Sequence, residues 1–305
     1  MTTPFFTSTS QLRAFVKLNA SLPWDSLQPY VDTAERLYLR KYLSGSKLDL
    51  LEPNEEFMTL ARRALAPLAV YLAADEMSVS IGDSGITVQN EKDRRSPASD
   101  RKIAAAKRSL LSRGTAALSD LLQFVLSLDG LDLTDCPRLS VLGSLLVRRL
   151  DDFETYVSLD GSHVSFLDLV PLMRSIQGRL QQLIGRELTA RLIAPTGADE
   201  SASLHLLLEE LRERSRAYIV YETASLHTSL QTRQQRKGSH YTEWQPVIRP
   251  LFEDVADSGS WYRQMSAESL AAITRLTDEN AAELGMERSD TSLQFNGPKR
   301  RIFHL

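Results

Sequence analysis

Cysteine is almost absent from this chain, which contains only Cys136. A lone thiol cannot form an intramolecular disulfide, so a disulfide-held secreted scaffold is excluded and a cytoplasmic setting is favoured. No apolar run approaches the roughly 18 residues of a membrane-spanning helix, so we expect no membrane partner. The N-terminal MTTPFFTSTSQLR also lacks the basic region and long apolar core of a secretory signal.

Sequence patterns for catalysis, metals and cofactors are missing as well. There is no His-x-x-x-His, no cysteine pair, no Gly-x-x-x-x-Gly-Lys-Ser and no Gly-x-Gly-x-x-Gly. The carboxylate pairs Asp151-Asp152 and Glu209-Glu210 fall on predicted helices, where adjacent residues do not face each other. We therefore expect a non-enzymatic protein with no catalytic residue, no metal and no cofactor.

One stretch, VSIGDSGITV at residues 79–88, contains the GDSG that surrounds the nucleophile of chymotrypsin-like proteases. In that arrangement the histidine precedes the serine, whereas every histidine of this chain follows Ser84. The five histidines are His163, His205, His227, His240 and His304. The stretch also fails the Gly-x-Ser-x-Gly pattern of the α/β-hydrolases, because Ile86 stands where the last glycine should be.

The same stretch predicts a β-hairpin with Asp83-Ser84 as a two-residue loop. This register pairs Val79 with Val88, Ile81 with Ile86 and Gly82 with Gly85. The four aliphatic residues then share one face, and an isolated hairpin is only marginally stable in water. That face must cover either the helices of the same chain or a neighbouring subunit, and the sequence leaves both open.

Charge is balanced overall, with a net charge of −3, which argues against a protein that coats nucleic acid. Basic residues gather at Lys92, Arg94, Arg95, Arg101 and Lys102, and again at Arg233, Arg236 and Lys237. Acidic neighbours dilute the first group, and no aromatic residues interleave to stack on bases. We interpret both as solvated loops.

An internal repeat is suggested by residues 12–29, LRAFVKLNASLPWDSLQP, and residues 153–171, FETYVSLDGSHVSFLDLVP. With one inserted residue they align hydrophobic to hydrophobic, and Pro29 matches Pro171 near the first turn of a predicted helix. The fold class expected is mainly α, with two tandem, similar helical domains at 1–135 and 136–290. The first carries the hairpin, and residues 291–305 form an extended C-terminal tail.

Apolar spacing predicts the helices. Expected helices cover 31–44, 55–76, 100–128, 137–151, 201–230 and 266–284, with a further helix after Pro171. The first of these buries Val31, Ala34, Leu37 and Tyr38. The buried stripe of 100–128 is Ile103, Ala106, Leu110, Ala117, Leu121, Phe124 and Leu128. Pro246 and Pro250 interrupt a helix, and residues 257–260 form a turn.

The segments TSTSQLRAFVKLNAS, AERLYLRKYLS and LARRALAPLAVYLAADEM followed by SIGDSGITV resemble helical head-to-tail connector proteins of tailed bacteriophages. They are similar above all to a group of prophage-type proteins of Bacteroidetes of comparable length. The shared pattern is an opening segment, a helix with an alanine–glutamate pair (Ala34-Glu35) ending near a glycine loop (Ser44-Gly45), and a long helix.

The resemblance implies a virion component that forms a ring with like subunits and contacts portal and tail proteins, while DNA passes through as cargo. It would be cytoplasmic during assembly and part of the virion afterwards. The subunit contacts expected are Val79, Ile81, Ile86, Val88, Arg94, Arg95, Ile302 and Phe303. A monomeric helical adaptor or regulatory protein that binds a host partner is the alternative.

Overall fold

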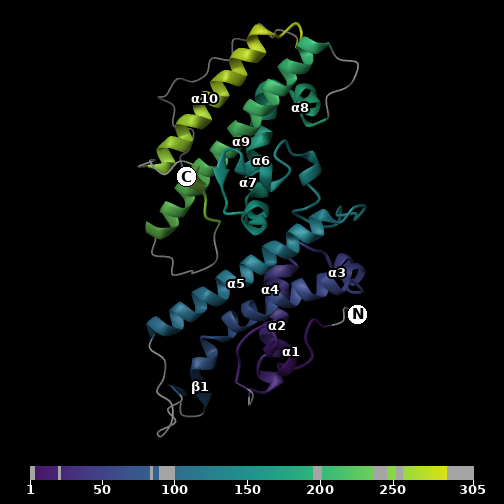
Figure 1. Ribbon diagram of the computed structural model, residues 1–305. Helices are drawn as coiled ribbons and strands as arrows, with labels where there is room; N and C mark the ends of the chain where they lie inside the picture. Colours follow the sequence, from purple (N-terminus) through teal and green to yellow (C-terminus); the bar gives the residue numbers. More distant parts are fainter. Residues whose placement is uncertain are drawn as a thin grey trace.

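A computed structural model describes residues 4–19, 22–82, 85–88, 100–194, 201–236, 246–251 and 257–286. The fold is mainly helical, as predicted, with two small antiparallel sheets in these residues. The first half forms the lower part of Figure 1 and the second half the upper part, with α5 lying along the boundary between them.

The α-helices of the first half are α1 (Thr9–Arg13), α2 (Gln28–Ala34), α3 (Gly45–Leu51), α4 (Glu55–Ala73) and α5 (Asp100–Ser127). Those of the second half are α6 (Leu150–Glu154), α7 (His163–Ile184), α8 (Arg186–Ile193), α9 (Ala202–Arg236) and α10 (Ser258–Glu279). The strands are β1 (Val79–Gly82), β2 (Gly85–Val88), β3 (Val157–Ser158) and β4 (Arg249–Pro250). Short 3-10 turns cover Trp24–Ser26, Glu76–Ser78 (η3) and Leu142–Ser144.

The antiparallel pair α4 and α5 forms the body of the first half (Figure 1). Helix α4 begins at its N-cap Asn54, whose side chain accepts a hydrogen bond from the Phe57 amide at 3.0 Å. The polar break at residues 52–54 is therefore a helix start, as the sequence indicates. The C-terminal half of α4 is almost fully buried, from Ala64 to Ala69.

The predicted helix at 31–44 is interrupted by a π-helical turn, η2 (Glu35–Leu39). The Arg40 amide donates to the Glu35 carbonyl at 2.9 Å, a spacing of five residues that shifts the helical phase. Leu39 is consequently buried and Leu37, predicted to be buried, is 44% exposed. The prediction for Leu37 is wrong because a regular 3.6-residue period was assumed.

Helix α5 has almost the predicted bounds, but its buried stripe covers only the C-terminal half. Ala117 and Leu121 are buried, whereas Ala106 is exposed. The first turns of α5 extend beyond the core and face α4 on one side only. At the crossing, a Cβ added to Gly114 would lie 2.6 Å from Cγ of Leu68, so the absence of a side chain permits the close approach.

The hairpin has the predicted register. Val79 pairs with Val88, Ile81 with Ile86 and Gly82 with Gly85. The loop residues Asp83 and Ser84 lie outside the described residues. Besides each other, the chief neighbour of the two strands is the preceding turn η3 (Glu76–Ser78). Figure 1 places β1 at the end of the first half that is remote from the second half.

In the second half, α9 and α10 run side by side, and α7 packs against α9 (Figure 1). Tyr221 of α9 and Trp261 of α10 meet edge to face with ring centroids 5.4 Å apart, and Tyr156, just before β3, meets Tyr221 in the same way at 5.8 Å. Strand β4 pairs with β3, so residues 246–250 are extended and not an interrupted helix. Proline is tolerated in such an edge strand.

Pro171 is not near a first turn, as the repeat predicted, but is the ninth residue of α7. Proline inside a helix cannot donate to the carbonyl four residues earlier, here that of Leu167. Nη1 of Arg138 donates to this carbonyl instead, at 3.2 Å. The bond that the proline removes is thus replaced by a side chain from outside the helix.

Residues 137–151 were predicted to form a helix and do not. Only the 3-10 turn at Leu142–Ser144 and the start of α6 are helical. Gln177 on α7 holds the segment by accepting from the Leu146 amide and donating to the Ser144 carbonyl, each at 2.8 Å. These tertiary bonds and the consecutive burial of Leu145, Leu146 and Val147 override the apolar periodicity.

Helix α10 begins earlier than predicted. Asp257 is its N-cap and accepts from the amides of Gly259 and Ser260, at 3.1 and 3.4 Å. The residues taken for a separate turn are therefore the first turn of the helix. Gly185 ends α7 at φ 87° and separates it from α8.

The internal duplication is not shown. The two segments aligned as a repeat differ in local structure, since Pro29 lies in the first turn of α2 and Pro171 in the interior of α7. The halves also share one continuous apolar core, which includes residues from α1 to α10. The boundary predicted at 135/136 falls in the segment that joins α5 to α6, and the tail at 291–305 lies outside the described residues.

The close approach at Gly114 gives a stability prediction. Gly114→Ala should lower the free energy of unfolding by about 1–2 kcal/mol, because overpacking outweighs the gain in helix propensity. Gly178→Ala in α7 is the matched control, since a Cβ there meets nothing within 4 Å. It should raise stability by about 0.5–1 kcal/mol. Urea unfolding followed by circular dichroism measures both, and equal effects would contradict the close-packing account.

Candidate functional site

The most strongly built polar cluster lies where the two halves meet. Asp168 of α7 receives Lys41 and Tyr42 from the first half and Arg138 from the connecting segment. Nζ of Lys41 is 2.7 Å from Oδ1 of Asp168, and the Tyr42 hydroxyl donates to the same oxygen at 2.7 Å. Arg138 donates to that oxygen as well. One carboxylate therefore links three parts of the chain.

The environment of this cluster explains its geometry. Only 10% of the Asp168 side chain is exposed, against 35% for Lys41 and 25% for Arg138. The Tyr42 ring is buried between the cations, with Lys41 Nζ 5.3 Å and Arg138 Cζ 5.6 Å from its centroid. Burial and the neighbouring Asp168 carboxylate raise the pKa of Tyr42, so it remains a neutral hydrogen-bond donor. The cluster is a structural clamp.

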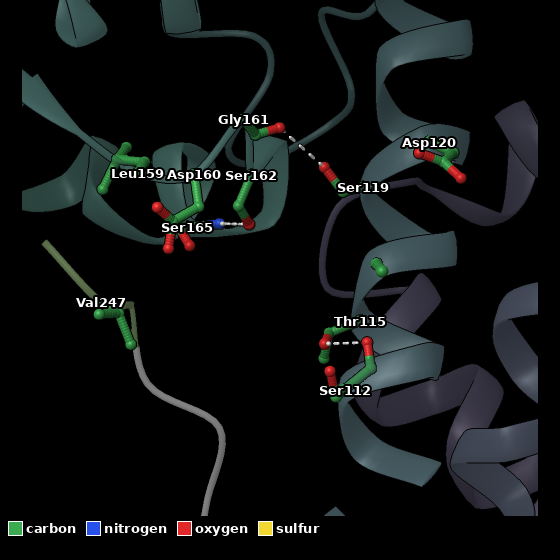
Figure 2. Close-up of a pocket in the computed structure, with 11 residues that line it drawn as sticks. Ser112, Thr115, Ser119, Asp120, Leu159, Asp160, Gly161, Ser162, Ser165 and Val247 are labelled. Atoms are coloured by element: carbon green, nitrogen blue, oxygen red, sulfur yellow. Dashed lines mark hydrogen bonds between the residues drawn. The ribbon is translucent and has the colours of Figure 1, made fainter. Parts of the chain in front are cut away.

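A hollow of about 330 Å³ lies between α5 and the turn that leads from β3 into α7 (Figure 2). Its lining includes Ser112, Thr115, Ser119, Asp120, Asp160, Gly161, Ser162, Ser165 and Val247. Figure 2 shows Ser119 on one wall facing Gly161 and Ser162 on the other, with Val247 at a third side. Hydroxyl groups dominate both walls.

These hydroxyls already bond the backbone. Ser119 Oγ accepts from the His163 amide at 2.8 Å and donates to the Gly161 carbonyl at 3.5 Å. Ser162 caps α7 by accepting from the Ser165 amide at 3.1 Å. The turn that forms the wall opposite α5 contains Asp160 at φ 55° and Gly161 at φ 69°. In the described structure these serines are not paired with a base, so the hollow is a joint between α5 and α7.

The histidines in the described part of the chain are His163 on α7 and His205 and His227 on α9. No group of three metal-capable side chains occurs there. Burial lowers the pKa of His163 and of His227, and His227 Nε2 lies 2.9 Å from the Pro246 carbonyl oxygen. His205 is exposed on α9. His240, His304 and Ser84 lie outside the described residues.

The carboxylate pair Asp151-Asp152 has a structural role. Oδ2 of Asp152 accepts from the amides of Arg148 and Arg149, each at 3.2 Å, and so caps α6. In the second pair, Glu209 and Glu210 form ion pairs with Arg212 and Arg214 on their own helix. Both pairs therefore have partners within the fold.

The contacts predicted from sequence separate into two groups. Val79, Ile81, Ile86 and Val88 lie together in the hairpin, through the register above. Arg94, Arg95, Ile302 and Phe303 lie outside the described residues. The sequence reasoning missed the Asp168 clamp. A signal was present, because Asp168 interrupts the otherwise apolar run FLDLVP at 166–171.

Comparison with known proteins gives one match. Residues 30–128 match a family model described as a family of unknown function (DUF6712). This range extends from α2 to the end of α5 and includes the hairpin. No curated protein and no solved structure matches significantly. No described helix is both long enough and apolar enough to span a membrane.

The clamp predicts that removing the Asp168 carboxylate strongly lowers the free energy of unfolding. Asp168→Ala leaves two cations and a buried hydroxyl without their acceptor, so we expect a loss of about 2–3 kcal/mol in the free energy of unfolding. Asp160→Asn is the control, because its ion pair with Arg249 is exposed (51% and 63%) and should be worth less than about 1 kcal/mol, while asparagine tolerates the φ of 55° at this position. Urea unfolding measures both, and a loss no larger than the control would contradict the clamp.

The lowered pKa values of His163 and His227 predict that the stability of the protein depends on pH. A folded pKa lowered below the unfolded value near 6.5 means that the unfolded chain binds protons first, so stability falls as pH falls below about 6.5. Each histidine contributes at most about 1.4 kcal/mol per pH unit. The variant His163→Gln/His227→Gln should flatten melting temperature between pH 7.5 and 5.5, whereas His205→Gln should not. If the slope of melting temperature against pH is unchanged in the double variant, groups other than His163 and His227 control the pH dependence.

Proposed function

We propose that this protein is a non-enzymatic structural subunit of a phage-like particle, of the head-to-tail connector type, and that it assembles into a ring. The observation that carries the proposal is the β1–β2 hairpin. Among the described residues, its strands contact chiefly each other and η3, and it lies at the end of the body remote from the second half (Figure 1). A two-stranded ribbon of this kind requires further contacts to be stable.

The composition of the hairpin suits a subunit contact. The register places two aliphatic cross-strand pairs two residues apart, as one apolar face requires. A short ribbon also offers strand edges to which a neighbouring chain can add. A neighbouring subunit that covers this hairpin would form a head-to-tail contact, and such contacts close into rings when the rotation between subunits allows it.

Two further observations support the proposal. The clamp at Asp168 and the continuous core join the two halves, so the hairpin is presented by a rigid body. The matched family range, 30–128, is the unit that carries the hairpin, so this unit is what the chain shares with that family. The partners proposed are like subunits, portal and tail proteins, with DNA as passing cargo. The localisation proposed is cytoplasmic during assembly and virion afterwards.

Light scattering coupled to size exclusion, with negative-stain images, tests this proposal. The chain has a mass of 34.2 kDa, so a closed ring stands out in both mass and shape. Ile81→Ser/Ile86→Ser should reduce the assembly to monomers, because it removes the apolar contact. The control is Leu206→Ser, which removes a leucine that is 70% exposed on α9, and it should leave the ring intact.

Other outcomes discriminate the alternatives. A wild-type monomer at every concentration tested would contradict self-assembly and favour the helical adaptor. A ring that survives the hairpin double variant but disappears on truncation after residue 290 would move the contact to Ile302 and Phe303. Circular dichroism of every variant ensures that loss of the ring is not loss of folding.

A further inference from the structure

Two adjoining hollows occur in the first half, on the flank of α5 that faces the end of α1. Their volumes are about 500 and 510 Å³, and they share Ala14, Phe15 and Arg113. The first is also lined by Arg13, Lys17, Val70, Ala106, Ser109 and Leu110. The second is also lined by Arg63, Pro67, Ala117 and Asp120. Together they form one continuous depression between the residue 13–17 segment, α4 and α5.

Basic side chains surround this depression. Arg13, Lys17, Arg63 and Arg113 line it, and Lys102 lies on the same flank of α5, eleven residues before Arg113; we call these five the basic face. All five are exposed, and none has a carboxylate within ion-pair distance in the described part of the chain. Arg101 and Arg108 extend the positive charge onto the solvent side of α5.

The local charge is one-sided although the whole chain is slightly acidic. From residue 101 to residue 119, α5 contains five cations and no carboxylate. One of the five, Lys107, is on another side of the helix, where it pairs with Asp75. Among the described residues that line the depression, only Asp120 carries negative charge. Unpaired cations gathered on one face attract a polyanion.

The surface chemistry distinguishes between possible polyanions. The large exposed hydrophobic residues of the described chain are Leu37, Leu50, Met77, Leu206, Leu230, Val247 and Leu251, and none lines the basic face. The apolar side chains that do line the depression, Phe15, Val70 and Leu110, are only partly exposed, so they offer an acidic amphipathic peptide little apolar surface. Phe15 packs edge-on against Phe6, with centroids 6.1 Å apart, so it is not a free platform on which a single strand could stack.

We infer that the basic face binds the phosphate backbone of double-stranded DNA without reading its sequence. The eleven residues from Lys102 to Arg113 span about 16 Å, over which a duplex presents about nine phosphate charges. Contact through phosphates alone needs no base readout and gives dissociation constants on the order of 1–100 µM at physiological salt. The choice of DNA as the duplex rests on the proposed function, but the contact does not require ring formation.

Fluorescence anisotropy with a labelled 24-base-pair duplex tests this inference on the full chain. Lys17→Ala/Arg63→Ala/Lys102→Ala should weaken binding at least tenfold in low salt and lower the salt slope by about 2–3, because each cation–phosphate pair adds about 0.9 to that slope. Arg113 is kept because it donates to the Phe15 carbonyl at 3.1 Å. The control is Arg174→Ala/Arg186→Ala/Arg275→Ala, which removes the same charge from exposed sites in the second half.

Each of the following results either supports or contradicts binding of duplex DNA at the basic face. Weakened binding in the first triple variant with full binding in the control supports the basic face. No binding by the wild type in 50 mM salt, or equal weakening in both variants, overturns it. Tighter binding of a labelled poly-glutamate peptide than of the duplex would identify the face as a site for an acidic protein and also overturns it. Particle mass, measured in parallel, tests the proposed ring separately.

Discussion

The arrangement of the two halves depends on one carboxylate, that of Asp168. It holds Lys41 and Tyr42 of the first half against α7, and Arg138 of the connecting segment completes the cluster. Arg138 also occupies the Leu167 carbonyl that Pro171 leaves without an intrahelical donor. The proline, the carboxylate and the clamp therefore form one unit. Such clusters contribute less net stability than their number of bonds suggests, but they fix one arrangement of the parts.

With the two halves joined at Asp168, the hollow, the hairpin and the basic face lie in different regions of the described structure. The hollow between α5 and α7 has the serines and helix terminus of a binding site, yet Ser119 bonds the backbone across the α5–α7 joint and Ser162 caps α7. Among the described residues, the strands of the hairpin contact chiefly each other and η3, and the hairpin lies far from this joint (Figure 1). The basic face lies on a third region, built from α1, α4 and α5. The hairpin and the basic face are therefore the surfaces that we propose meet partners.

Several elements could be derived from the sequence because their signals are local. The hairpin register follows from glycines around a two-residue loop, and α4, α5 and α9 follow from apolar periodicity between polar breaks. Predictions failed where distant residues decide the outcome. Leu37 is exposed because of a π-helical turn, residues 137–151 are held by Gln177, and Pro171 lies within a helix because Arg138 satisfies the freed carbonyl.

The sequence by itself determined the helical class, the hairpin and the lack of any recognisable catalytic pattern, since each depends on neighbouring residues. The tertiary structure alone decided the clamp and the basic face. Lys41 and Asp168 are separated by 127 positions, and Arg13 and Arg113 by 100, so no periodicity relates them. Charge acts through space: cations that are dispersed and diluted along the chain become a one-sided surface only when helices bring them together.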